Sequence, residues 1–175
     1  KFDPEGVDEI RRKFFGTLYN TYGFFALYAN VDGWNQEQGT KNQDLQEIDK
    51  WVLSKLNSLV KEVTAAYEAY EPTKAGRAIS DFVQDDLSNW YVRLNRKRFW
   101  GGEMDADKQA AYYTLYTCLK TVAQLMAPNA PFYADRLYRD LTDETVHLST
   151  WPVADEAMIN LELERSMSLA QQATS

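Results

Sequence analysis

The chain has few of the residues that build metal sites and covalent cross-links. It contains one cysteine, Cys118, and one histidine, His147. A single cysteine excludes a disulfide within the chain and suits a reducing compartment, so we expect a cytoplasmic protein. A structural zinc site needs more cysteine and histidine ligands than this chain supplies. Glu144 and His147 have the Glu-x-x-His spacing of di-iron bundles, but such sites use the motif twice and there is no second histidine. We therefore predict no metal site.

Long apolar runs are also missing. No segment approaches the ~20 apolar residues of a transmembrane helix, so no membrane contact is expected. Residues 1–12 are polar and charged, which is unlike a signal peptide. The chain starts without methionine and stops in a helix-like stretch, which suggests a piece of a longer protein.

Catalytic and nucleotide-binding motifs are absent as well. The sequence has no P-loop, no G-x-G-x-x-G and no G-x-S-x-G nucleophile motif. Three aspartates, Asp81, Asp85 and Asp86, could suggest acid–base chemistry, but Asp81 can pair with Arg77 and the other two can simply be solvated. No catalytic residue is assigned.

Positive charge is scarce overall but concentrated in one place. The formal net charge is -7, yet residues 87–102 contain four basic side chains and no acidic one. The segment SNWYVRLNRKRFW places these basic residues among aromatic ones. Cations near a helix C-terminus are stabilised by the helix dipole, which is one explanation. Guanidinium groups beside aromatic rings also bind phosphates and stack on single-stranded bases, which is the other.

The spacing of apolar residues is helical through most of the chain. Helices are predicted over residues 7–30, 44–70, 72–99, 105–126 and 131–141, with a further helix beginning at 161–172. Residues 31–43 are predicted to form a long loop, and residues 145–152 an extended segment packed on the helices. The predicted fold is all-α: a bundle of about five long, mostly antiparallel helices with a short extended segment near the C-terminus.

The predicted helices carry specific expectations for capping and burial. Asp44, with Glu47 three residues later, is expected to cap the helix over 44–70. The helix over 7–30 has two apolar sides, which include Ile10 and Tyr19. The helices over 44–70, 72–99 and 105–126 are expected to bury Ile48, Val52, Leu56, Leu59, Val63, Tyr67 and Tyr70; Ile79, Phe82, Val83, Leu87, Trp90, Tyr91 and Leu94; and Ala111, Leu115, Cys118, Val122 and Leu125.

Several segments resemble one enzyme family. YEPTKAGRAISDFVQDDLSNWYVRLNRKRFW, LMAPNAPFYADRLY and VHLSTWP are similar to the anticodon-binding helical domain of class I aminoacyl-tRNA synthetases. The similarity is greatest to the isoleucyl type and covers nearly the whole chain. Residues 81–100 are the most specific part, whereas APFYADRLY and VHLSTWP also occur in valyl-type relatives.

The resemblance implies a division of the chain and a set of ligands. Residues 1–152 would form the helical anticodon-binding domain, and residues 153–175 a linker and the start of a further helix. The parent enzyme would use ATP and Mg²⁺ to join isoleucine to its tRNA. Its H-I-G-H and K-M-S-K-S signatures are absent here, so the fragment alone would hold no cofactor and would not be catalytic.

The implied partners are the tRNA(Ile) anticodon stem-loop and the catalytic domain of the parent chain. The implied tRNA-binding residues are Arg93, Asn95, Arg96, Lys97, Arg98 and Trp100. Contacts from all four basic residues to phosphates would give a log–log salt slope of about -3, at ~0.7 per phosphate of a single strand. Two alternatives remain: a helical docking module for other proteins, and the same domain of a valyl-type synthetase.

Overall fold

The computed structural model describes residues 4–38 and 45–174, and these residues form helices joined by turns and irregular segments. The α-helices are α1 (Pro4–Ile10), α2 (Gly16–Asp32), α3 (Glu47–Glu68), α4 (Pro72–Asp81), α5 (Arg93–Trp100), α6 (Ala106–Met126), α7 (Pro131–Thr142) and α8 (Leu161–Ala173). Two π-helical segments, η1 (Arg11–Phe15) and η3 (Phe82–Val92), and three short 3₁₀ turns, η2 (Gln36–Gln38), η4 (Val146–Leu148) and η5 (Glu156–Met158), complete the set. The described residues contain no strand, so the all-α prediction is confirmed.

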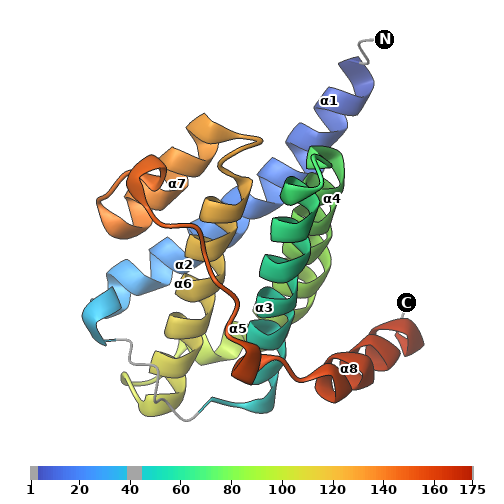
Figure 1. The fold of residues 1–175 in the computed structure, drawn as a ribbon. Coiled ribbons are helices and arrows are strands. Elements are labelled where there is room, and N and C mark those ends of the chain that lie inside the picture. The colour runs from blue at the N-terminus through green and yellow to red at the C-terminus, as the bar shows by residue number, and fades with distance from the viewer. Residues whose placement is uncertain (1–3, 39–44, 175) are drawn as a thin grey trace.

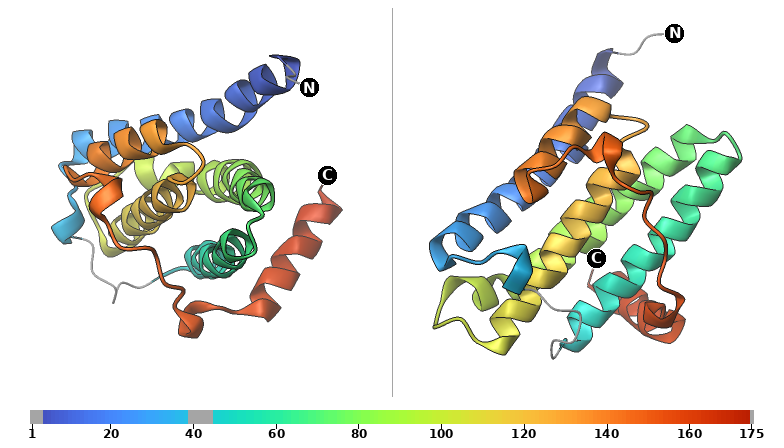
Figure 2. Two further views of the ribbon diagram at one scale, coloured as in Figure 1. Left: turned by 45° about the horizontal axis from the view of Figure 1, so that its top comes forward. Right: turned by 60° about the vertical axis from the view of Figure 1, so that its left-hand side comes forward.

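Two of the long helices are composite rods. α1, η1 and α2 follow one another without a break, and so do α4, η3 and α5, because the residues at each junction keep right-handed helical backbone angles. α3, the α4–α5 rod and α6 lie side by side, with α2 and α7 to one side and α8 to the other (Figures 1 and 2). Among the described residues, no helix combines the length and low polarity needed to cross a bilayer.

The start of α3 differs from the prediction. Asp44 lies outside the described residues, and α3 begins at Glu47 with Gln46 as its N-cap. The capping box is formed by Gln46 and Asp49, whose Oδ2 accepts a hydrogen bond from the Gln46 backbone N–H at 2.9 Å. The helix also ends earlier than expected. Tyr70 stands in the α3–α4 turn with a φ of 58°, so its side chain is exposed rather than part of the apolar stripe.

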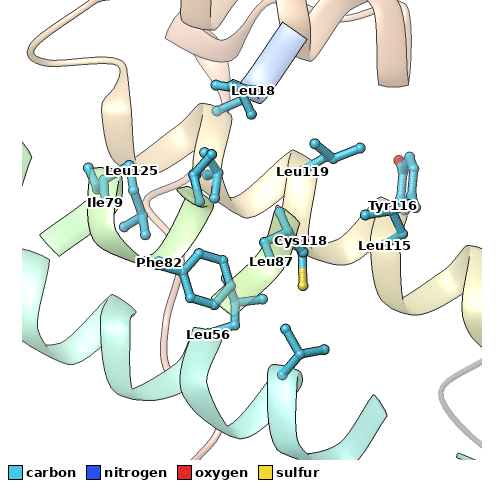
Figure 3. Close-up of a cluster of buried hydrophobic side chains, with 14 of the residues drawn as sticks. Leu18, Leu56, Ile79, Phe82, Leu87, Leu115, Tyr116, Cys118, Leu119 and Leu125 are labelled. Carbon is cyan, nitrogen blue, oxygen red and sulfur yellow. The ribbon is translucent and has the colours of Figure 1, made fainter. Parts of the chain in front are cut away.

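The core forms where α3, the α4–α5 rod and α6 meet (Figure 3). The predicted stripe of α6 is buried throughout. In the predicted stripe of α3, Val52, Leu56, Leu59 and Val63 are buried, while Ile48 and Tyr67 are half-buried. Cys118 lies inside this cluster near Leu87, and burial raises the pKa of its thiol. The prediction that Cys118 is buried is confirmed. In the first rod, however, Ile10 and Tyr19 are exposed, whereas Phe15 and Tyr28 are half-buried against the core.

The π-helical segment η3 changes which residues of the α4–α5 rod face the core. The backbone N–H of Arg93 donates to the carbonyl of Ser88, five residues earlier. The wider turn brings every fourth residue to the same side, so Leu87, Tyr91, Asn95 and Phe99 are all buried. An α-helical period had placed Leu94 in the core, and that prediction was wrong: its side chain is exposed. Trp90 is half-buried against the core.

The C-terminal part of the chain packs back on the bundle. The 145–152 segment contains η4 rather than a continuous extended stretch, and Trp151 Nε1 donates to Thr64 Oγ1 of α3 at 2.8 Å. α8 is joined to α3 through Glu164, which accepts hydrogen bonds from the hydroxyls of Ser54 (2.5 Å) and Ser58 (2.9 Å). The division into residues 1–152 and 153–175 stays a prediction, although α8 contacts the bundle directly.

Candidate nucleic-acid interface

The predicted basic and aromatic residues lie on α5, at one end of the bundle. Five exposed side chains of this helix form what we call the α5 surface: Arg93, Leu94, Arg96, Lys97 and Trp100. The same end of the bundle holds the first turns of α3 and α6 (Figure 2). The α5 surface therefore presents three cations, an indole ring and an aliphatic side chain to the solvent.

The three cations of the α5 surface are available to a ligand. Among the described residues, no carboxylate forms an ion pair with Arg93, Arg96 or Lys97. The nearby carboxylate Asp86 pairs with Lys55 of α3 at 3.2 Å. Pairing of the basic cluster with Asp85, Asp86 or Glu103 would have favoured a purely structural role, and none of these pairs is present in the described part of the chain.

The end of α5 favours positive charge. The helix stops at Trp100, and Gly101 and Gly102 turn the chain away, Gly102 with a φ of 76° that suits glycine. The last carbonyl groups of a helix carry partial negative charge, so Lys97 and Arg98 in the last turn are stabilised there. The local structure thus tolerates a cluster of cations without neutralising all of them.

Arg98 has a different environment from its neighbours. Its side chain is only 10% exposed, and Asp49 beside it is fully buried. Nη1 donates to Asp49 Oδ1 at 2.8 Å, Nη2 to Asp49 Oδ2 at 2.9 Å, and Nε to Asp107 Oδ2 at 3.0 Å. Burial alone would lower the pKa of Arg98, but the hydrogen bonds to Asp49 and Asp107 outweigh it and raise that pKa further. The guanidinium therefore stays charged and is held within the fold.

Asn95 is also held within the fold. Its Nδ2 donates to the backbone carbonyl of Tyr91 at 2.7 Å, and its Oδ1 accepts from Arg98 Nη1 at 3.1 Å. Arg98 and Asn95 were expected to contact RNA directly. The structure instead occupies both side chains in intramolecular hydrogen bonds, because Asn95 is buried and Arg98 lies between Asp49 and Asp107.

Tyr91 completes this buried cluster. Its hydroxyl donates to Asp49 Oδ1 at 2.6 Å. Burial, followed by the charge of Asp49, raises the pKa of Tyr91 well above its ordinary value, so the hydroxyl keeps its proton. Sequence reasoning missed Asp49 and Asp107 as partners of Arg98. The available signal was the position of Asp49, a charged residue that directly follows Ile48 on the apolar side of the helix and would need a buried partner.

The other residues considered from the sequence do not gather into a site. Glu144 and His147 are both exposed, and the described residues contain no group of three or more side chains suited to hold a metal ion. The Arg77–Asp81 ion pair that the sequence allows is not formed within the described structure. Burial, Asp81 and Asp86 together raise the pKa of Asp85, which is exposed at the surface of η3.

Comparison with known proteins identifies the family of the chain. Residues 49–175 match the family model for the anticodon-binding domain of tRNA ligase. The whole chain aligns with isoleucine–tRNA ligases at 63% identity in Bacteroides thetaiotaomicron, 61% in Porphyromonas gingivalis and 44% in Dehalococcoides mccartyi. The chain spans only 16% of the first two relatives and 18% of the third. Because the family model covers most of its residues, the chain belongs to the family of anticodon-binding domains of tRNA ligases.

Proposed function

We propose that this domain binds the anticodon stem-loop of tRNA(Ile) through the α5 surface, as part of an isoleucine–tRNA ligase. The observation that carries the proposal is a set of three exposed cations on α5, beside the exposed ring of Trp100, at one end of an otherwise acidic protein. No carboxylate in the described part of the chain pairs with them. Arg93, Arg96 and Lys97 would contact phosphates or base edges, and Trp100 would stack on an unpaired base.

The charge distribution supports a single RNA-binding place. The net charge of -7 repels phosphate from most of the surface, so an anticodon loop would be drawn only to the α5 surface. With Arg98 paired internally, three rather than four cations remain, and the expected log–log salt slope becomes about -2 at ~0.7 per phosphate.

Isoleucine specificity rests on the relatives. Those compared above are named isoleucine–tRNA ligases, which supports tRNA(Ile) over the valyl-type alternative. The joining reaction, with its ATP and Mg²⁺, would belong to the catalytic domain of the parent chain, and the parent enzyme would work in the cytoplasm.

The test is a binding titration with labelled anticodon stem-loops. The Arg96→Ala variant should bind the tRNA(Ile) stem-loop several-fold more weakly than the wild type. Arg77→Ala is the matched control, because Arg77 is an exposed arginine at the opposite end of the same rod and forms no ion pair with any described residue. Equal loss in both variants would refute the site, and stronger binding of a tRNA(Val) stem-loop would favour the valyl type.

A second role, docking against other parts of the parent chain, is favoured by a separate surface. An apolar groove of about 550 Å³ runs between the first rod, α4 and α6, and is lined by Ile10, Phe14, Phe15, Ile79 and Met126 among others. It lies where α4 begins and α6 ends, so it is at the far end from the α5 surface. We propose that the catalytic domain packs here. Ile10→Asp, at an exposed position, should loosen that contact in the full-length enzyme, measured by limited proteolysis, without weakening stem-loop binding.

A further inference from the structure

Arg98 joins three helix ends at the base of the α5 surface. It lies in the last turn of α5, while Asp49 is in the first turn of α3 and Asp107 in the first turn of α6. Asp107 is held in turn by Gln46, whose Nε2 donates to Asp107 Oδ1 at 2.7 Å. One guanidinium therefore connects the end of α5 to the start of both neighbouring helices and to the segment that enters α3.

The guanidinium has no donor left for an RNA phosphate. An arginine side chain offers N–H groups from Nε, Nη1 and Nη2 in a fixed planar fork. In this structure Nε donates to Asp107, Nη1 to Asp49 and Asn95, and Nη2 to Asp49 and to both the backbone carbonyl and a carboxylate oxygen of Asp107. A phosphate could bind Arg98 only if one of these bonds were broken.

The same contacts fix the direction in which the exposed cations point. Lys97 and Arg96 are one and two residues before Arg98 on the same short helix, so the rotation of α5 about its axis decides where they project. Two carboxylates on two different helices, Asp49 of α3 and Asp107 of α6, hold that rotation. Paired and hydrogen-bonded charges of this kind favour one defined arrangement.

We propose that Arg98 is a positioning residue for RNA binding: it does not touch the RNA, and it holds α5 so that Arg93, Arg96, Lys97 and Trp100 face the anticodon loop. This inference rests on the proposed function of the α5 surface. It replaces the direct contact expected for Arg98 from the sequence.

The direction in which one charge-removing substitution changes the affinity for RNA distinguishes a positioning role of Arg98 from direct contact. Asp107→Asn removes a negative charge close to the basic cluster and releases part of Arg98. If Arg98 positions α5, this variant binds the tRNA(Ile) stem-loop several-fold more weakly despite the improved charge. If Arg98 contacts RNA, the released guanidinium binds more tightly, and that result would overturn the proposal. Glu103→Gln is the control: it removes a nearby exposed charge that has no ion pair in the described structure, and it should leave binding equal or slightly tighter.

The salt dependence of binding supplies a second readout. Arg98→Gln should lower the affinity and leave the log–log salt slope unchanged, because no phosphate contact is lost. Arg96→Gln should reduce the slope by about 0.7, the contribution of one phosphate. Urea unfolding of each variant confirms that it is folded under the assay conditions.

The results of these experiments distinguish a failure of the proposed RNA-binding function from a failure of the positioning role of Arg98. If Arg96→Gln changes neither affinity nor slope, the proposed function of the α5 surface fails and the positioning role fails with it. Two results would refute only the positioning role, provided that Arg96→Gln has its expected effect. One is tighter binding of the stem-loop by Asp107→Asn. The other is a salt slope reduced by the contribution of one phosphate in a folded Arg98→Gln variant.

Discussion

Lys108 of α6 and Asp32 at the end of α2 form a salt bridge of 2.6 Å, although the lysine side chain is only 5% exposed. Tyr112 donates to the same carboxylate oxygen of Asp32 at 2.5 Å. Burial alone would raise the pKa of Asp32, but the hydrogen bonds from Lys108 and Tyr112 outweigh it and lower that pKa. The pair ties the first rod to α6 close to the end that carries the α5 surface.

Asp32→Asn is expected to destabilise the fold by about 3 kcal/mol, because it leaves the buried ammonium of Lys108 without its counter-charge. Urea unfolding of the wild type and the variant measures the loss. The double variant Asp32→Asn/Lys108→Met should recover most of it, since no unpaired charge then remains inside. A single variant as stable as the wild type would show that Lys108 finds water or another partner.

Acid sensitivity should depend on Asp135 of α7. Hydrogen bonds from Arg139 and from Thr145 lower the pKa of Asp135 to about 2. Because its pKa is lower in the folded protein than the ordinary 3.8, Asp135 stabilises the fold above pH 3.8, and this contribution disappears as the pH falls through about 2. Melting temperatures of the wild type and Asp135→Asn should differ most near neutral pH and converge near pH 2. A difference that stays constant with pH would contradict this assignment.

The thiol of Cys118 should report on opening of the core. It is fully buried, and burial raises its pKa, so the reactive thiolate is scarce and inaccessible in the folded state. A thiol-reactive dye should label the native protein only as fast as the core opens, and should label it at once in urea. Rapid labelling of the native protein would mean that α6 does not pack as the structure describes.

The attachment of α8 to α3 depends on Glu164. Glu164→Ala removes the acceptor of both serine hydroxyls on α3, so amide hydrogen exchange should become faster in α8 while α3 and α6 stay protected. Glu162→Ala is the control, because Glu162 is an exposed glutamate in the first turn of the same helix. Faster exchange throughout the bundle would show that α8 is part of the core fold. This measurement also tests the predicted boundary between residues 152 and 153.

Most of the helices could be predicted because their apolar residues follow the α-helical period. α3 and α6 are long and have one apolar side, and the stripe from Val52 to Val63 is buried as expected. Their ends were less predictable. Gln46 is the N-cap of α3, and its partner in the capping box is Asp49, three residues later. Helix boundaries read from a sequence are uncertain by one or two residues, and here the helix begins at Glu47.

The inner and outer sides of α5 could not be predicted with an α-helical period. After the π-helical segment, every fourth residue from Leu87 to Phe99 is buried, so Asn95 faces the core and Leu94 faces the solvent. The role of Arg98 depended further on contacts with Asp49 and Asp107, from helices distant in the sequence. A run of Leu87, Tyr91 and Phe99 at multiples of four residues was the signal for this period.

The central claim is that three cations of α5 bind the phosphates of an anticodon loop. The most direct measurement is the affinity of the wild-type chain for the tRNA(Ile) stem-loop at a series of salt concentrations. We expect a log–log slope of about -2, at ~0.7 per phosphate, and a slope close to zero for the variant Arg93→Ala/Arg96→Ala/Lys97→Ala. A wild-type affinity that does not change with salt, or an equal slope in the triple variant, would contradict the account.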